Sequence, residues 1–181
     1  MNKMDENFYV KVLNTRRYVY LFDDINNFTA EIVCTKLRVM NFSNKSKPIY
    51  LEINSGGGSV TDGFAIIDTI KMIKAPVYTI INGVAASMAG LISIMGAKRF
   101  ITPNATWMEH STSDLVGDYL QHIKDRTTFL VRLEKRMNDL LKQHTQLTTH
   151  QMTQIKNGEL WLFADEVIKY GIADKIIDKN L

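Results

Sequence analysis

A serine, a histidine and a glycine turn are the residues of this chain whose types suit chemistry on a carbonyl group. Ser87 lies in the small-residue segment 82–90, between an apolar run that predicts a buried strand and one that predicts a buried helix. Unpaired N–H groups at a helix N-terminus favour negative charge, which suits an attacking hydroxyl and a developing oxyanion. The same segment also fits a structural turn whose small residues let helix and sheet pack closely.

A second strand-to-helix turn carries three consecutive glycines, residues 56–58, whose N–H groups no side chain obstructs. A phosphate-binding P-loop is not predicted, because Ser59-Val60 stands where that motif requires a lysine and a serine or threonine. The dinucleotide-binding fingerprint fails for lack of the third glycine at its required spacing. The turn is therefore either an oxyanion hole or a plain tight turn.

His110 ends the predicted strand 106–110. An imidazole can take and return a proton near neutral pH, although a histidine at a strand end also fits a structural role. The members of a serine–histidine–acid triad need be neighbours only in space. Three downstream carboxylates are therefore candidates, and spacing alone does not choose among Glu159, Asp165 and Asp174.

Composition predicts one domain over residues 1–181, because 45% hydrophobic content in 181 residues supplies a sizeable core. The net charge of +3 is mild and scattered, so nucleic-acid binding is not expected. Cys34 is the single cysteine, which indicates a buried thiol in a reducing compartment, and no metal-ligand spacing is present. Without a membrane-length apolar run or a signal peptide, we expect a soluble cytoplasmic protein.

Hydrophobic periodicity predicts alternating strands and helices. Predicted strands are 17–22, 49–54, 77–81, 99–102 and 106–110, and predicted helices are 27–40, 60–74, 91–95, 119–144 and a last one ending at Tyr170-Gly171. A loop is expected over 41–48. A helix of about 26 residues is roughly 39 Å long, more than a domain of this size needs for its own core. Part of helix 119–144 is therefore expected to project and pack against another subunit.

Taken together, these motifs resemble the caseinolytic (Clp) serine peptidase family, the ClpP group. The resemblance covers Arg17 to Ile177 and rests on segments 53–58, 83–89 and 108–110, with support from 136–140, 144–145 and 170–174. It implies a crotonase-like α/β spiral of β-β-α units. Residues 1–16 would be an N-terminal arm, and about 112–158 a handle region containing the long projecting helix. In the family, handles interdigitate between two heptameric rings that enclose a chamber, which only unfolded segments or short peptides enter.

The resemblance also implies residue roles. Ser87 matches the nucleophile, His110 the general base, and the N–H groups of Gly58 and Met88 the oxyanion hole. Glu159 stands where the family has the triad aspartate, and its extra methylene moves the carboxylate by about 1.5 Å unless the rotamer compensates. The expected activity is that of a serine endopeptidase acting through an acyl-enzyme on polypeptide substrates. No cofactor and no metal are implied.

Three departures from the family concern partner surfaces. The stretch before Arg17 is shorter than the family's axial loop and first helix, which contribute to docking of an AAA+ unfoldase. Glu52 replaces an aromatic residue that lines the docking pocket, and a carboxylate weakens hydrophobic docking there. Segment 114–118 replaces the glycine-rich strand that pairs with substrate. The catalytic motifs are therefore closer to the family pattern than the partner surfaces are.

Two other functions stay open at this point. A CoA-dependent hydratase or isomerase shares the spiral fold and an oxyanion hole of two N–H groups, but it needs no serine–histidine pair. A catalytically impaired ring subunit that regulates an active partner is suggested by Glu159 and by the altered segment 114–118.

Overall fold

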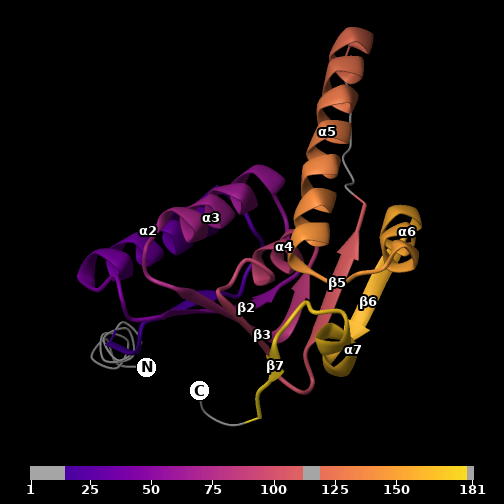
Figure 1. The fold of residues 1–181 in the computed structure, drawn as a ribbon. Coiled ribbons are helices and arrows are strands. Elements are labelled where there is room, and N and C mark those ends of the chain that lie inside the picture. Colours follow the sequence, from indigo (N-terminus) through magenta and orange to yellow (C-terminus); the bar gives the residue numbers. More distant parts are fainter. Residues whose placement is uncertain (1–14, 112–118, 179–181) are drawn as a thin grey trace, which may run out of the picture.

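The apolar runs form the strands of one mostly parallel sheet, with α2, α3 and α4 together on one of its faces (Figure 1). The computed structural model describes residues 15–111 and 119–178. Most of the predicted arm 1–16 and all of segment 114–118 lie outside the described residues. In chain order the elements are β1 (Tyr18–Leu21), α2 (Asn27–Ser43), β2 (Ile49–Ser55), α3 (Val60–Met72), β3 (Val77–Ala86), α4 (Met88–Ser93), β4 (Lys98–Ile101), β5 (Thr106–His110), α5 (Leu120–His144), α6 (Thr149–Asn157), β6 (Glu159–Phe163), α7 (Ala164–Lys169) and β7 (Lys175–Ile176).

Strand β3 is the branch point of the sheet. Its residues 78–81 pair with β4, while residues 84–86 pair with β5, and both pairings are parallel. Strand β5 then pairs with β6 in antiparallel orientation. The carboxyl ends of β3 and β5 therefore lie at the same edge of the sheet, a usual place for ligand sites in parallel sheets.

The buried faces of the helices follow the predicted periodicity. In α2 the buried side chains recur at helical spacing, and they include Ala30, Val33, Leu37 and Met40 as expected. Cys34 is also buried, with a free thiol, as predicted. Asn26 begins the helix with a capping box, in which its side chain and that of Thr29 each accept a backbone N–H.

Several element boundaries differ from the prediction by one or two residues, and those of β3, α4 and α2 differ by more or lie at informative places. Strand β3 runs to Ala86 rather than ending at residue 81, because pairing with β5 continues the ladder. The following helix occupies Met88–Ser93 rather than 91–95. Helix α2 continues into the predicted loop as far as Ser43, where the Arg17 guanidinium binds the carbonyl oxygen of Met40 at 2.9 Å. The Met40 carbonyl also accepts the backbone N–H of Asn44 at 3.1 Å, so the guanidinium adds a further hydrogen bond at the end of the helix.

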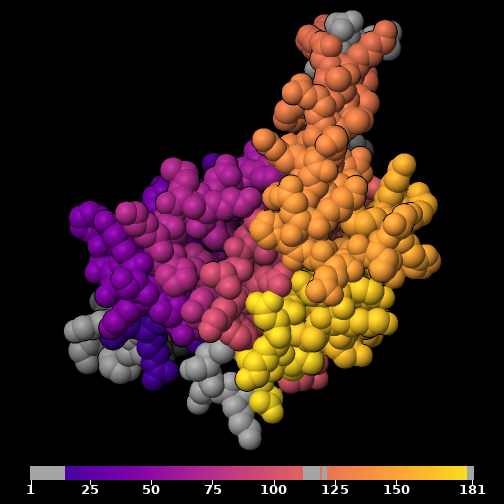
Figure 2. Space-filling view, viewed as in Figure 1, coloured from indigo at the N-terminus to yellow at the C-terminus, as the bar shows by residue number. Residues whose placement is uncertain are grey.

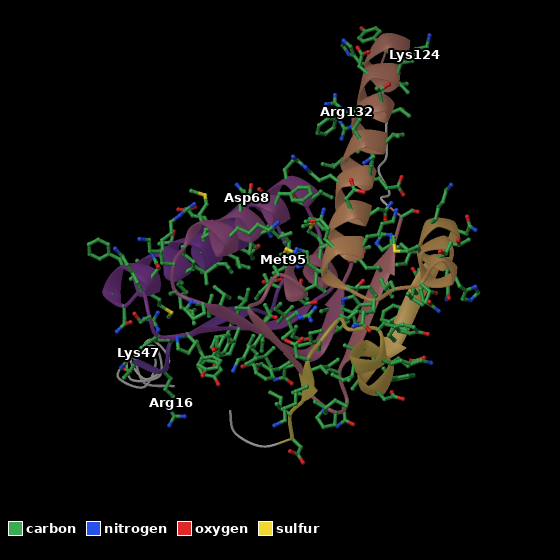
Figure 3. All side chains as sticks on the ribbon, in the orientation of Figure 1. Arg16, Lys47, Asp68, Met95, Lys124 and Arg132 are labelled. Atoms are coloured by element: carbon green, nitrogen blue, oxygen red, sulfur yellow. The ribbon has the colours of Figure 1, made fainter. Side chains whose placement is uncertain are left out.

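Helix α5 projects well beyond the body of the molecule (Figures 1 and 2). Its described buried residues Met137, Leu140 and Leu141 all lie in its last third. Lys124 and Arg132, labelled in Figure 3, are exposed on the projecting part, as is Phe129 at 52%. The prediction of a long, partly unsupported helix over 119–144 is confirmed to within one residue. Within the described residues, no helix combines the length and apolarity needed to cross a membrane.

Candidate active site

Ser87 sits on a sharp turn between the end of β3 and the start of α4. Its backbone has φ 53° and ψ −126°, a conformation that a residue with a Cβ rarely adopts. The turn is fixed on both sides, because the Ser87 N–H donates to the Met108 carbonyl at 2.8 Å and the Ser87 carbonyl accepts from Leu91 at 3.1 Å. Such strained strand-to-helix turns display a serine hydroxyl at the edge of a sheet. The side chain of Ser87 is half-buried.

The glycine turn lies directly against this serine turn. Gly57 has φ 101°, and a Cβ there would lie 2.7 Å from the Ala86 carbonyl oxygen and 2.9 Å from the Cβ of Ser87. Only glycine permits both the backbone angle and the approach. By contrast, a Cβ at Gly56 would have no neighbour within 4 Å. The close contact with the serine turn is therefore specific to Gly57, whereas a Cβ at Gly58 would meet the backbone of Ile25.

The two predicted oxyanion donors lie on these touching segments. Gly58 forms a parallel β-bridge with Ile25, whose hydrogen bonds are made by the residues on either side of Gly58. The Ile25 N–H donates to the Gly57 carbonyl, and the Ser59 N–H donates to the Ile25 carbonyl, each at 2.7 Å. In that arrangement the N–H of Gly58 itself points away from Ile25. Met88 is the first residue of α4, so its N–H has no acceptor within the helix. A Cβ at Gly57 would lie 3.1 Å from the Met88 nitrogen, so the two donor segments are neighbours.

His110 ends β5, the strand that pairs with the last residues of β3. Its Nδ1 lies 2.6 Å from the carbonyl oxygen of Ser111. Because a carbonyl oxygen only accepts hydrogen bonds, Nδ1 carries a proton, and in the neutral imidazole Nε2 then keeps its lone pair. That is the tautomer that a general base for a serine hydroxyl requires. Within residues 15–111 and 119–178, no hydrogen bond joins the side chain of Ser87 to this imidazole.

Glu159 lies directly opposite His110 in the antiparallel ladder of β5 and β6, so their side chains share one face. Its carboxylate accepts a hydrogen bond from Trp161 Nε1 at 2.7 Å. The imidazole of His110 donates elsewhere, to Ser111. The fold thus brings Ser87, His110 and Glu159 to adjacent strands without the hydrogen bonds of an assembled triad.

The other two candidate acids have different surroundings. Asp174 accepts from the backbone N–H of Arg99 at 2.7 Å and pairs with its guanidinium. Asp165 is exposed in the first turn of α7. Register therefore favours Glu159 among the three. In the described parts of the chain, no group of three or more histidine, cysteine, aspartate or glutamate side chains is placed to hold a metal ion.

Glu109 is a residue that sequence reasoning missed. Its side chain is 1% exposed, and Oε1 has no hydrogen-bond partner. Burial raises the pKa of this carboxyl well above its ordinary value, although a hydrogen bond with the His110 backbone opposes the shift. The signal was present, because alternation in the strand 106–110 puts residue 109 on the face opposite His110. A Cβ at Gly90 would lie 2.8 Å from Oε1, so Glu109 packs against α4, the helix that follows Ser87.

Comparison with known proteins agrees with the motifs. The family model for Clp protease matches residues 2–180. The chain is 34% identical over 168 residues to the ATP-dependent Clp protease proteolytic subunit of Streptococcus equi subsp. equi, covering 91% of this chain and 86% of that protein. It is 33% identical over 168 residues to the protein of the same description from Streptococcus mutans serotype c, with the same two shares. The serine turn, the glycine turn and the histidine lie at one edge of the sheet, in agreement with these matches. The matches show that this chain belongs to the Clp protease family.

Proposed function

We propose that this protein is a serine-type endopeptidase that hydrolyses peptide bonds through an acyl-enzyme. The observation that carries the proposal is the strained turn at Ser87, against which the glycine turn packs so closely that Gly57 tolerates no side chain. His110, at the carboxyl end of the adjacent strand, holds its Nδ1 proton and so has a basic Nε2. Membership of the Clp protease family supports the same activity.

In the proposed reaction, His110 Nε2 takes the proton of the Ser87 hydroxyl as Oγ attacks the carbonyl carbon of the scissile peptide. The N–H groups of Gly58 and Met88 stabilise the resulting oxyanion. Collapse of the tetrahedral intermediate breaks the C–N bond, and His110 gives its proton to the leaving amine. Water then adds to the acyl-enzyme with His110 as base again, which releases the acid product and restores Ser87.

Glu159 is the carboxylate that we assign beside the imidazole. It faces His110 across the ladder, so its negative charge favours the imidazolium that forms in each proton transfer. Its side chain is exposed and bonded to Trp161, which limits this contribution through solvent screening. The proposal therefore gives Glu159 a smaller share of the rate than Ser87 or His110.

We also propose that the protein acts as stacked heptameric rings around a chamber, on unfolded segments or short peptides. Support comes from the projecting part of α5 and from large apolar side chains exposed on α2 and α5. The exposed apolar residues of α2 and α5 include Phe28, Val39, Phe42, Phe129 and Val131. Burial of such side chains against other copies would provide the main stabilisation of an assembly. Native mass spectrometry that showed only monomer at micromolar concentration would contradict the ring model.

An AAA+ unfoldase remains a proposed partner, with an altered docking surface. Tyr18, Tyr50 and Tyr78 form a row of ring contacts across the sheet, with centroids 4.9 and 5.7 Å apart. Glu52 lies two residues along β2 from Tyr50, on the same face of the strand, and accepts a hydrogen bond from Asn82 at 2.6 Å. A partner that covers this face must satisfy a carboxylate as well as aromatic rings, so it needs a polar or basic group there.

The decisive experiment is labelling of size-fractionated protein with a fluorophosphonate probe, for the wild type and for Ser87→Ala. We expect a label on the assembled wild type and none on the variant. Absence of label in the assembled wild type would contradict the proposal. Equal residual peptidase activity in wild type and Ser87→Ala would instead indicate a subunit without catalysis of its own.

A further inference from the structure

We propose that the backbone carbonyl of Ser111, and not the Glu159 carboxylate, is the hydrogen-bond acceptor that orients the catalytic imidazole of His110. Ser111 is then a positioning residue, because it acts through His110. The inference rests on the proposed peptidase function and names the third member of its site.

The contact between His110 and Ser111 has the geometry that the role needs. Nδ1 lies 2.6 Å from the carbonyl oxygen, a short N–H···O distance. In a serine–histidine–acid triad, the acid chiefly fixes the tautomer and the direction of the ring. A carbonyl oxygen fixes the same tautomer, because it also accepts only. The carbonyl group contributes a dipole to the site, whereas a triad acid contributes a full negative charge.

Ser111 is itself held by the end of helix α6. Its N–H donates to the Ile155 carbonyl at 3.1 Å, and its hydroxyl donates to the Lys156 carbonyl at 2.9 Å and the Ile155 carbonyl at 3.3 Å. These carbonyl groups belong to the last turn of the helix, where acceptors lack intrahelical donors. Ile155 is 3% exposed and anchors α6 in the core. The serine hydroxyl therefore fixes the direction of the carbonyl that the imidazole meets.

Glu159 has other contacts, which weaken it as the direct acceptor. Its carboxylate binds Trp161 Nε1 at 2.7 Å, and its backbone carbonyl accepts from Gln154 Nε2 at 3.2 Å. Its side chain is exposed, so water competes for the same oxygens. To replace Ser111 it would have to exchange an existing hydrogen bond and order an exposed side chain, which has an entropic cost.

The test compares Glu159→Gln, Ser111→Ala and Ser111→Thr with the wild type as assembled full-length protein. Glutamine keeps an oxygen acceptor for Trp161 but removes the charge. Alanine removes the hydroxyl bonds to α6, whereas threonine restores a hydroxyl. Thr153→Ala is the matched control, because it removes a hydroxyl bond to the Thr149 carbonyl, 2.8 Å, within the same helix. The readouts are the second-order rate of fluorophosphonate labelling, and kcat and KM on blocked fluorogenic dipeptide amides.

We expect Glu159→Gln to lower kcat/KM by about threefold, the small share that its solvent-screened charge contributes, and to leave the acidic midpoint of the pH profile within about 0.5 pH unit of wild type. Loss of a true orienting acid costs about 10⁴-fold. Ser111→Ala is expected to lower kcat and the labelling rate about tenfold with KM unchanged, Ser111→Thr to restore them, and Thr153→Ala to match the wild type.

A loss of more than tenfold in Glu159→Gln would overturn the inference, as would a Ser111→Ala variant that loses less than threefold or is not rescued by threonine. Thermal unfolding and assembly size are measured for each variant, so a kcat loss in a variant that melts and assembles like wild type is assigned to positioning. Absence of labelling in the wild type would be a failure of the proposed function, which is a distinct result.

Discussion

The two sides of the candidate site are built in different ways. The Ser87 side is formed by backbone groups. They are a strained serine turn, a glycine turn in contact with it, and two N–H groups on the touching segments. The His110 side is formed mainly by side chains and their hydrogen bonds. The imidazole binds the backbone carbonyl of Ser111, and the Glu159 carboxylate binds the indole of Trp161.

This difference predicts how each side responds to mutation. A backbone site that depends on the absence of a Cβ has no alternative arrangement, because interiors are close-packed and backbone atoms cannot move independently. Side chains that form hydrogen bonds can change rotamer and partner without moving the backbone, so the His110 side has more freedom to adjust. We therefore expect substitutions on the Ser87 side to cost more activity than substitutions on the His110 side.

The largest effect is expected from Gly57→Ala. The new methyl group would press on the Ala86 carbonyl and the Cβ of Ser87, in a backbone conformation that alanine disfavours. The glycine turn must then move away from the serine turn and take the Gly58 donor with it. Loss of one oxyanion donor costs about 10²–10³ in kcat, so we expect at least a hundredfold fall in kcat/KM on fluorogenic dipeptide amides.

Gly56→Ala is the matched control for that variant. A Cβ at Gly56 meets open space, so activity and melting temperature should stay at wild-type values. If Gly56→Ala lost as much activity as Gly57→Ala, the effect would lie in the general flexibility of the turn. The contact with Ser87 would then not be its cause.

A smaller effect, on stability, is expected from Glu109→Gln. Glu109 neighbours His110 in sequence but packs under α4, so it joins the two sides of the site. Because burial raises its pKa in the folded protein, the folded state retains a proton that the unfolded chain releases above about pH 4.5. The unfolded state binds fewer protons there, so stability contributed by Glu109 is lost as pH rises from about 4.5 through the folded pKa.

Glutamine does not titrate, so Glu109→Gln should remove this pH dependence. We expect its melting temperature to exceed that of wild type at pH 8 and the difference to shrink at pH 5. Each kcal/mol of stability corresponds to about 2–4 °C for a chain of this size. A difference in melting temperature that is the same at both pH values would contradict the assignment of a buried, protonated carboxyl.

The sequence predicts the Ser87 side of the site better than the His110 side. Glycine runs and small-residue turns reveal backbone geometry, because only glycine tolerates angles such as those of Gly57. The long helix was also predictable, since its periodicity is local. The end of β3 at Ala86 was not, because it depends on pairing with β5, and such pairings between distant segments leave no local pattern.

The hydrogen bonds around His110 could not be predicted for a related reason. Ser111 and Trp161 show no unusual pattern in the sequence, and their roles depend on the end of α6 and on the register of β5 with β6. Spacing left three acids open, and only the ladder places Glu159 opposite His110. Side-chain networks depend on tertiary contacts, and several residue types satisfy each contact.

The smallest effect is expected from Trp161→Phe, which removes the indole N–H bond to Glu159 but keeps an aromatic ring. If Ser111 orients His110, the released carboxylate keeps only its small electrostatic share, so kcat/KM should change by less than about twofold. Trp161 is 52% exposed, so stability should change by no more than about 0.5 kcal/mol. Trp107, 0% exposed, is the one other tryptophan and reports by its fluorescence that the core is intact.

The double variant Trp161→Phe with Glu159→Gln makes this prediction specific. Two residues that act on His110 as a unit give a coupling energy in a double-mutant cycle, whereas residues outside the orienting contact do not. We expect the effects of the two substitutions on log kcat/KM to add. A tenfold change in Trp161→Phe that disappears in the Glu159→Gln background would show that the indole controls access of the carboxylate to His110. The tolerance of the His110 side would then come from competition between two acceptors for Nδ1, with Trp161 deciding which one holds it.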